Sequence, residues 1–335
     1  MNEVYIYPVI IVFSFLFTEL IRRYTLNNNF LDTPNERSSH TIPTPRGGGI
    51  AFVIIFLLSL FFIKSLPTGI IWALLGSGIL AAGIGFWDDY GQLSAKWRLL
   101  SHFIAAFWAL YWLGGVSALQ IFGFDSITSW IGFGLIIFLL VWLLNLFNFM
   151  DGIDGIAASE AVFVACAGAY FAWMLDLEYL TFILLSLAAA TFGFLLLNWS
   201  PAKIFMGDVG SGFLGLILGV IAYESILKGV SVWIWGILLA VFLVDSGVTL
   251  TRRFFNGEKW YEAHCSHAYQ NAAKKWGHKK VTISVILINL FYLFPLSHIA
   301  YSEPNYAIYM FLLAYMPLVF IALKLKAGKA VTALI

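Results

Sequence analysis

The feature that most constrains this chain is a series of apolar stretches, each about 17–20 residues long, that recurs from one end to the other. A stretch of that length crosses about 30 Å of hydrocarbon as a helix, which satisfies its own backbone hydrogen bonds inside a bilayer. Of the 335 residues, 61% are hydrophobic and 11% are charged, a composition that no soluble fold tolerates on its surface. Because alternating strand patterns are absent, which disfavours a β-barrel, we expect an all-α integral membrane protein.

The expected fold is a polytopic bundle of about 10–11 transmembrane helices that forms one domain over residues 1–335. The first stretch lacks a basic leader and a small-residue cleavage site, so we expect it to be retained rather than cleaved as a signal peptide. The predicted spans are Val4–Ile21, Gly47–Lys64, Ile70–Phe86, Leu99–Gly115, Trp130–Phe147, Ile156–Leu175, Tyr179–Leu197, Gly210–Leu227, Val232–Leu250, Val281–Ala300 and Tyr306–Leu323.

Basic residues predict the orientation of this bundle. If the loops after odd-numbered spans face the cytoplasm, they and the C-terminal tail contain every one of the 19 Lys and Arg residues except Lys64 and Lys228. The positive-inside rule then places the N-terminus outside and the C-terminus in the cytoplasm. Cys166 falls in a span and Cys265 in a cytoplasmic loop, so we do not expect a disulfide.

The octapeptide from Asn148 to Gly155 places Asp151 and Asp154 between two hydrophobic runs. If this segment is helical, the two carboxylates project from one face, because they are three residues apart. Together with Asn145 and Asn148 they would then hold a ligand with hydroxyl groups or ring donors. An ordinary Asp-Gly turn is the alternative.

Two other cytoplasmic loops carry carboxylates. Asp88 and Asp89 end the third span, ahead of Lys96, and adjacent carboxylates repel one another unless a metal ion or a substrate proton accompanies them. Asp208 follows Lys203 in a loop that ends in a Gly-Ser helix start, where amides attract anions and a carboxylate suits a phosphate-bound metal. The alternatives are a solvated helix end for the first loop and a simple N-cap for the second.

Basic residues dominate the remaining two loops. Arg37, His40 and Arg46 precede a triple glycine in the first loop, where Arg46 can bind a phosphate through both guanidinium nitrogens, or the loop only anchors to anionic headgroups. The fifth loop, 251–280, suits phosphate or sugar contact, a solvated polar helix, or zinc. The residues of this loop that could make such contacts are Arg252, Arg253, His264 and His267.

An acidic residue also lies inside the ninth span. Asp245 is about 8 Å from the end of that span by helical rise, and an ionisable group at such depth is a functional candidate.

All of these clusters fall on one side of the predicted membrane. Carboxylates hold Mg²⁺, the metal bridges a diphosphate, and basic groups neutralise the charge of a moving phosphoryl group. A donor from the cytosol and an acceptor from the lipid can therefore meet there. An ion-coupled transporter is the competing class, but transporters place their ionisable groups near the bilayer midplane at broken helices.

The chain resembles the polyprenyl-phosphate N-acetylhexosamine-1-phosphate transferase superfamily, glycosyltransferase family 4, over roughly residues 32–270. Five motifs in the family's order carry the resemblance: DTPNERSSHTIPTPRGGG from Asp32, WDDYGQLSAKWRLL from Trp87, NLFNFMDGIDGIA from Asn145, NWSPAKIFMGDVGSGFLG from Asn198 and LVDSGVTLTRRF from Leu243.

This resemblance implies an enzyme of the bacterial inner membrane that transfers a sugar 1-phosphate from a UDP-sugar to undecaprenyl phosphate and releases UMP. It implies Mg²⁺ as cofactor, with Mn²⁺ as an alternative, no nucleic-acid partner, and a homodimer as an open question. Direct attack and a phospho-enzyme on an aspartate both stay open.

The resemblance also implies roles for individual residues. Asp88 is the base for the lipid phosphate, Asp89 completes the aspartate pair, and Lys96 is the lysine that follows it. Asp208 is the metal ligand. The residues expected to bind substrate are Arg46, Asn148, Asp151, Asp154, Lys203, Arg252, His264 and His267.

The fifth loop departs from several subgroups of this family. It reads AHCSHAYQ from Ala263, which looks closest to the starters of O-antigen synthesis that use N-acetylfucosamine or N-acetylquinovosamine. We therefore expect an N-acetylated 6-deoxyhexosamine as the sugar, with UDP-N-acetylglucosamine as the rival donor.

Overall fold

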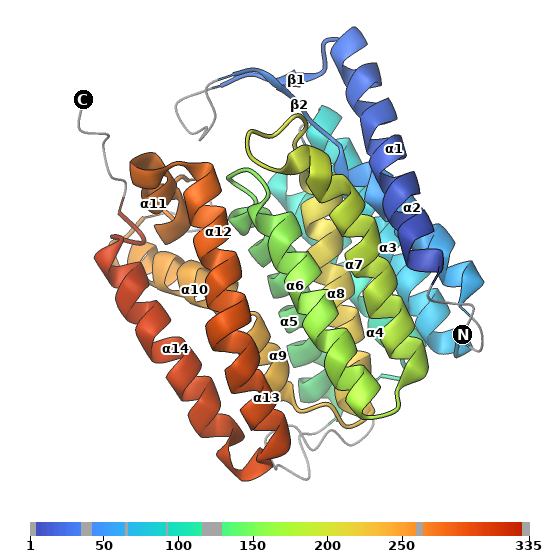
Figure 1. Cartoon of the computed structure of the whole chain (residues 1–335), viewed down its shortest axis with the longest axis vertical. Helices are drawn as coiled ribbons and strands as arrows, with labels where there is room; N and C mark the ends of the chain where they lie inside the picture. Colours follow the sequence, from blue (N-terminus) through green and yellow to red (C-terminus); the bar gives the residue numbers. More distant parts are fainter. Residues whose placement is uncertain are drawn as a thin grey trace.

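The computed structural model describes residues 5–34, 42–63, 66–91, 93–115, 129–258 and 264–329. These residues form an elongated bundle of helices whose long axes run roughly side by side (Figure 1). The expected all-α polytopic class is confirmed, because helices account for nearly all of the regular structure. The described strands are β1 (Leu31–Asp32) and β2 (Thr44–Pro45), which pair antiparallel with Leu31 opposite Pro45.

The N-terminal two thirds of the chain supplies the main body of the bundle. Its helices are α1 (Ile6–Asn27), α2 (Gly49–Ser59, continued by the 3-10 turn Leu60–Phe62), α3 (Thr68–Gly91), α4 (Ala95–Trp112), α5 (Ser129–Met150), α6 (Ile156–Met174), α7 (Glu178–Asn198) and α8 (Asp208–Leu227).

The C-terminal third packs beside this body and contains more breaks. It comprises α9 (Val232–Leu238), α10 (Ala240–Phe255), α11 (Ala268–Trp276), α12 (His278–Ile288), the π-helical η3 (Asn289–Leu293), α13 (Phe294–Ser302), the 3-10 turn η4 (Pro304–Tyr306) and α14 (Ala307–Lys324).

A helix lies at each of the eleven predicted spans. Among the described residues, seven helices are long and apolar enough to cross a membrane, and a broken pair makes an eighth. That pair lies at the predicted ninth span, Val232–Leu250, and α9 and α10 are bent by 74° relative to each other. The helix α2 is shorter, α1 carries more charge and α4 is less apolar, so their crossing of the membrane stays a prediction.

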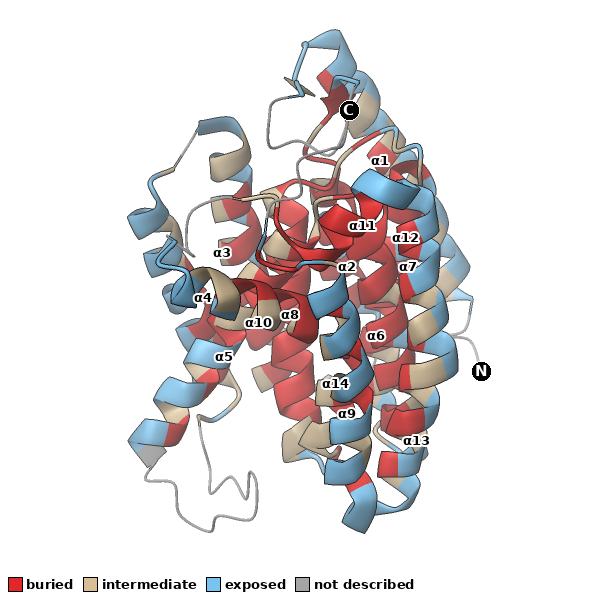
Figure 2. Ribbon diagram, turned by 90° about the vertical axis from the view of Figure 1, so that its left-hand side faces the viewer, coloured by how far each residue is buried: buried red, intermediate tan, exposed pale blue. Residues whose placement is uncertain are grey.

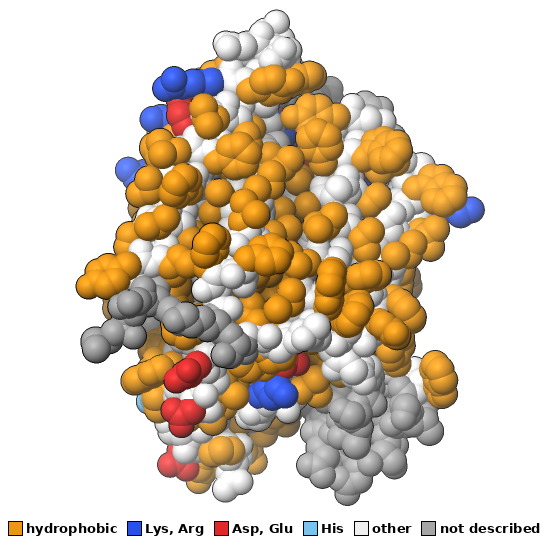
Figure 3. Space-filling model, turned by 90° about the vertical axis from the view of Figure 1, so that its right-hand side faces the viewer, with side chains coloured by type: hydrophobic (Ala, Val, Ile, Leu, Met, Phe, Trp, Pro, Cys, Tyr) orange, Lys and Arg blue, Asp and Glu red, His pale blue; other side chains and the backbone are white. Residues whose placement is uncertain are grey.

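Helix α8 is the centre of the bundle. In its most apolar stretch of 18 residues, 94% are buried, against 22% in α14 at the periphery (Figure 2). Hydrophobic side chains also cover a broad part of the outer face, with charged groups toward its two ends (Figure 3). Since α8 begins at Asp208, this carboxylate stands where the buried centre of the bundle meets its polar end.

Candidate active site

The segment that carries Arg46 is fixed against the loop that leads into α8. The N–H of Phe205 donates to the carbonyl of Pro45 at 2.8 Å, and the N–H groups of Gly48 and Gly49 donate to Phe205 and Met206 at 2.9 Å. These three hydrogen bonds hold the first loop, far away in sequence, beside the first residue of α8.

Asp89 closes the N-terminus of α8. Its carboxylate accepts the backbone N–H groups of Asp208 at 2.9 Å and Val209 at 3.2 Å, which would otherwise lack partners in the first turn. Gly207, with φ +77°, leaves room for this contact, because a Cβ there would lie 2.5 Å from Asp89 Oδ2. With its side chain only 2% exposed, Asp89 is committed to holding α3 and α8 together.

Arg46 joins two of the carboxylates. Its Nη2 lies 2.8 Å from an oxygen of Asp89 and 2.8 Å from an oxygen of Asp208. Burial opposes the charge of Arg46, but Asp89 and Asp208 together keep its pKa above the usual value. The guanidinium therefore stays charged across the physiological range.

Asp88 is held by an arginine that the sequence analysis did not assign to the site. Arg98 Nη1 lies 2.7 Å from Asp88 Oδ2 and 3.9 Å from Asp208 Oδ2, and the N–H of Leu93 donates to Asp88 at 3.0 Å. Arg98 therefore links the carboxylates of Asp88 and Asp208. Asp88 and Asp208 are thus adjacent, as a shared phosphate site requires.

The predicted lysine of this region lies on the other face of its helix. Lys96 is exposed at the start of α4, two residues before the half-buried Arg98. Residues two apart on a helix do not face the same way, so only one of these cations can reach Asp88. The choice of Lys96 came from the family resemblance, and its role stays a prediction.

The α5–α6 turn brings Asp151 to the same cluster. Burial and the negative charge of Asp208 raise the pKa of Asp151 well above its usual value, while the nearby Arg46 opposes that rise. Asn148, in the last turn of α5, accepts a hydrogen bond from the hydroxyl of Ser211 in the first turn of α8. The turn is therefore tied to the start of α8.

Asp154 does not share a helix face with Asp151. The predicted helix is absent there, because residues 151–155 form turns. Oδ1 of Asp154 lies 3.1 Å from Nδ1 of His278, and its Oδ2 accepts the N–H of Ala202 at 3.2 Å. Burial would raise the pKa of Asp154, but the hydrogen bond with His278 brings it below the usual value. Its observed contacts are with protein groups, and the predicted contact with substrate stays a prediction.

The charge balance of the cluster favours a cation. Four acidic side chains, those of Asp88, Asp89, Asp151 and Asp208, gather near only two guanidinium groups, and the raised pKa of Asp151 reflects this excess of acidic groups as well as burial. Within the described part of the chain, no three His, Cys, Asp or Glu side chains are arranged to hold a metal by themselves. The donor set still fits Mg²⁺, which usually takes one or two protein carboxylates and completes its shell with water and phosphate oxygens.

The segment His264–His267, called the histidine segment below, is anchored by Asp245. This buried carboxylate accepts the N–H groups of Ala268 at 2.9 Å and Tyr269 at 2.8 Å, and so caps α11. It also lies 3.2 Å from Nδ1 of His267, whose ring stacks on His264 with 4.9 Å between centroids. Both histidines precede α11 and lie outside any helix, so the solvated polar helix that was one interpretation of this loop begins only at Ala268.

This segment contacts the end of α5. The hydroxyl of Tyr269 donates to the carbonyl of Phe149 at 2.9 Å, and the rings of Phe149 and His267 stack. Burial and the neighbouring His267 lower the pKa of His264 to about 4, so that His264 is neutral at pH 7. A neutral imidazole here can exchange hydrogen bonds with an uncharged group such as a sugar hydroxyl.

Among the described residues, neither Lys203 nor Arg252 forms an ion pair with a carboxylate. Lys203 is exposed, and Arg252 is half-buried in the last turn of α10. The adjacent Arg253 pairs with Glu258 at 2.7 Å. Arg37 and His40, named from the first loop, lie outside the described residues.

Comparison with known proteins matches residues 71–226 to the model of glycosyl transferase family 4. A probable undecaprenyl-phosphate N-acetylglucosaminyl 1-phosphate transferase of Bacillus subtilis is 26% identical over 307 residues, which cover 89% of this chain and 84% of the relative. A decaprenyl-phosphate N-acetylglucosaminephosphotransferase of Mycobacterium leprae is 34% identical over 55% of this chain and 52% of its own length. A phospho-N-acetylmuramoyl-pentapeptide-transferase of Listeria monocytogenes is 29% identical over 63% and 69%. The matched region contains Asp88, Asp89, Asp151 and Asp208.

Proposed function

We propose that this chain, whose residues 71–226 match the model of glycosyl transferase family 4, transfers a sugar 1-phosphate from a nucleotide sugar to a polyprenyl phosphate in a bacterial cytoplasmic membrane. One observation carries the proposal: four carboxylates and two arginines converge at one end of a bundle of membrane-length helices. The names of the relatives, which combine polyprenyl phosphates with N-acetylated sugars, support the same reaction class.

Asp208 is the residue proposed to hold Mg²⁺. When bound, the ion supplies positive charge to the diphosphate of the donor. Arg46 and Arg98 balance charge on the transferring phosphoryl group, since both are already anchored by carboxylates at the site. Asp89 positions Asp208 by capping α8 and does not itself need to touch the substrate.

The acceptor phosphate is proposed to lie beside Asp88, which accepts its proton. A carboxylate suits this role when it is partly accessible, and the side chain of Asp88 is 9% exposed against 2% for Asp89. The acceptor therefore approaches from the α3–α4 side of the cluster.

For the donor, we propose UDP carrying an N-acetylated 6-deoxyhexosamine, the acceptor being undecaprenyl phosphate and the product an O-antigen precursor. The support is the histidine segment, which packs against Phe149 and so stands next to the turn that holds Asp151. UDP-N-acetylglucosamine is the rival donor, favoured by the names of the Bacillus and Mycobacterium relatives. Turnover of a panel of UDP-sugars, with undecaprenyl phosphate and Mg²⁺, distinguishes the two by UMP release.

Two substitutions test the proposed site. Asp208→Asn is expected to abolish UMP release while the protein still inserts into membranes, and Asp88→Asn to reduce turnover by about 10² or more at neutral pH. Asp176→Asn is the matched control, because Asp176 lies in the α6–α7 turn at the opposite end of the bundle. Full turnover by Asp208→Asn, or loss of UMP release by Asp176→Asn alone, would refute the assignment.

A further inference from the structure

The start of α12 contacts one residue of the turn 151–155, called the catalytic turn below. Nδ1 of His278, the first residue of α12, lies 3.1 Å from Oδ1 of Asp154. One helical turn later, the hydroxyl of Thr282 donates to the backbone carbonyl of Asp154 at 2.9 Å. His278 and Thr282 are four residues apart, so their side chains lie on the same face of α12. This face therefore holds Asp154 by both its side chain and its backbone.

The charges at the start of α12 favour this contact. The helix begins with His278, Lys279 and Lys280, and its first turn contains no acidic residue. Because the N-terminus of a helix carries partial positive charge, basic residues there are unfavourable and a nearby carboxylate is stabilising. Asp154 supplies that carboxylate from the catalytic turn. Since an ionised carboxylate only accepts hydrogen bonds, Nδ1 of His278 carries the proton in this contact.

The other side of the catalytic turn is held by the end of α7 and the loop that follows it. Oδ2 of Asp154 accepts the N–H of Ala202 at 3.2 Å, and the N–H of Gly155 donates to Oδ1 of Asn198 at 3.1 Å. The last two residues of the turn thus join α12 to the loop that leads into α8. Asp151 is three residues earlier in the same turn, so its position relative to the start of α8 depends on this junction.

Helix α11 extends these contacts along the whole turn. The hydroxyl of Tyr269, in its first helical turn, donates to the carbonyl of Phe149 at 2.9 Å. A Cβ added to Gly152 would clash with the same hydroxyl, so α11 also packs closely over the middle of the turn. Only Gly277 separates the end of α11 from His278. The segment from Tyr269 to His278 therefore contacts the beginning, middle and end of the residues around Asp151.

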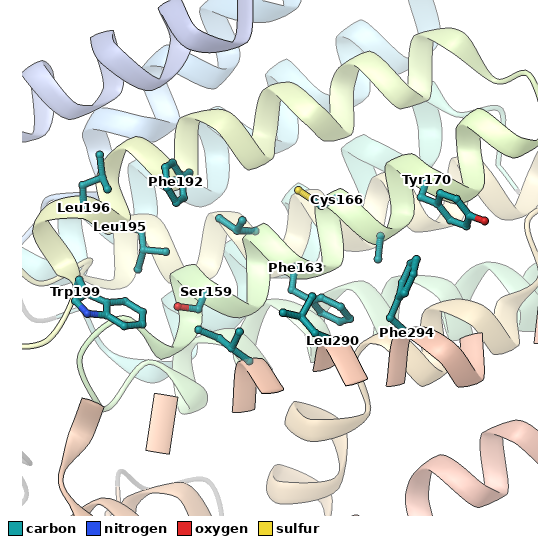
Figure 4. A pocket seen from close by; sticks show the side chains of 13 residues that line it. Ser159, Phe163, Cys166, Tyr170, Phe192, Leu195, Leu196, Trp199, Leu290 and Phe294 are labelled. Atoms are coloured by element: carbon teal, nitrogen blue, oxygen red, sulfur yellow. The ribbon is translucent and has the colours of Figure 1, made fainter. Parts of the chain in front are cut away.

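Farther along α6, a groove interrupts its packing against the C-terminal helices. This apolar groove of about 660 Å³ lies between α6, α7 and residues 286–294 (Figure 4). Polar contacts cross the same interface, where Asn289 donates to Glu160 at 2.6 Å and the hydroxyl of Tyr170 lies 3.2 Å from Nδ1 of His298. Because side chains do not fill the groove, the position of α12 against α6 depends strongly on such polar contacts. The contact made by His278 is the one beside the catalytic turn.

We propose that His278 is a positioning residue for the sugar-phosphate transfer, which holds Asp154 and thereby keeps Asp151 beside Asp208. This inference rests on the proposed function. His278 itself does not need to touch either substrate. Its effect on the rate comes from geometry, because a misplacement of about 1 Å at a reacting centre costs on the order of 10²-fold in rate.

Substitution of His278 tests the proposal through kinetics. His278→Leu removes the group that donates to Asp154, and we expect kcat for UMP release to fall about tenfold or more. KM for undecaprenyl phosphate should not change, because the acceptor is proposed to approach from the α3–α4 side. His278→Asn should recover most of the wild-type kcat, since its Nδ2 is bonded to Cγ as Nδ1 of histidine is and can donate to the same carboxylate.

His298→Leu is the matched control. It removes the contact of His298 with Tyr170, which joins α6 to the same C-terminal segment about 30 Å away by helical rise. We expect His298→Leu to lower the unfolding temperature about as much as His278→Leu does but to keep the wild-type kcat. Wild-type kcat in His278→Leu, an equal loss of kcat in His298→Leu, or failure of His278→Asn to recover activity would overturn the proposal.

A double-mutant cycle tests whether His278 acts through Asp154. If both residues act through one contact, the combination of His278→Leu with Asp154→Asn should reduce kcat no further than the more harmful single substitution. Losses that multiply in the double variant would show that the two residues act separately, and the proposed positioning role would fail.

Hydrogen exchange separates this inference from the proposed reaction, because it needs no turnover. In the full-length protein in phospholipid nanodiscs, amides of residues 148–156 should exchange faster in His278→Leu than in the wild type or in His298→Leu. Faster exchange in a protein that releases no UMP from any UDP-sugar would support the contact and refute the transferase reaction. UMP release by the wild type, with unchanged exchange and unchanged kcat in His278→Leu, would do the reverse.

Discussion

Adjacent aspartates in this site have different structural surroundings. Asp89 is buried, accepts two backbone N–H groups and binds Arg46, whereas Asp88 is bound from the other side by Arg98. Neighbouring residues on a helix point about 100° apart, so the two carboxylates face different elements. The sequence could predict that these acids meet Asp208, but it could not assign Asp89 to capping, because that contact depends on how α3 packs against α8.

Gly207→Ala tests the cap of α8. The substitution places a Cβ 2.5 Å from Asp89 Oδ2 and strains a residue with φ +77°, so we expect a loss of about 1–3 kcal/mol in the free energy of unfolding together with reduced UMP release. Thermal unfolding in detergent measures the first effect. The control is Gly83→Ala in α3, where a Cβ would meet nothing within 4 Å. Equal behaviour of the two variants would contradict the assignment.

His264 gives the protein a predicted sensitivity to acid. Burial and its neighbours His267 and Arg253, opposed by Asp245, lower the pKa of His264 from 6.5 to about 4. Because the unfolded chain then takes up the proton more readily, stability is lost as the pH falls from about 6.5 toward 4. His264→Gln should therefore show a smaller drop in unfolding temperature between pH 7 and pH 4.5 than the wild type. An identical drop would exclude this histidine as the source.

The predicted helices correspond closely to those observed, because uninterrupted apolar length is a direct signal of a spanning helix. The 74° bend between α9 and α10 gave no such signal, since the sequence around Leu239 is apolar without a proline. The sequence also did not indicate which residue caps α11, because the cap is Asp245 from a neighbouring helix. Glu160 did carry a signal, as an acid inside an apolar span, and it accepts a hydrogen bond from Asn289 at 2.6 Å across α6 and η3.

Asp245→Ala tests whether α10 positions the histidine segment. Loss of the carboxylate leaves two N–H groups of α11 and the ring of His267 without their partner, so we expect a destabilisation of about 1–3 kcal/mol. If the segment selects the sugar, the ranking of UDP-sugars should also change. Thr249→Val is the control, because it removes only the hydroxyl that donates to Asp245 at 3.1 Å. A changed ranking in Thr249→Val but not in Asp245→Ala would contradict the proposed anchor.

At the scale of the whole molecule, the catalytic cluster and the C-terminal end of the described chain share one side. The N–H of Gly328 donates to the carbonyl of Ser266 at 2.8 Å, which ties the segment after α14 to the histidine segment. The turn at Asp176 and the start of α1 lie at the other end of the bundle (Figure 1). The fold therefore places the catalytic cluster and the turn at Asp176 at opposite ends of the bundle. Which end faces the cytoplasm is predicted from the distribution of Lys and Arg.

The distribution of Lys and Arg predicts that the catalytic end faces the cytoplasm, because nearly all of these residues lie on that side. Lys324→Cys places a thiol at the exposed end of α14, and Asp176→Cys places one in the opposite turn. In intact spheroplasts a membrane-impermeant maleimide should label the thiol from Asp176→Cys, whereas the thiol from Lys324→Cys should react only after the membrane is disrupted. Peptide mass spectrometry separates both from the native thiols of Cys166 and Cys265. The opposite pattern would turn the carboxylates toward the exterior, where a cytosolic nucleotide sugar could not reach Asp208, and the proposed reaction would fail with it.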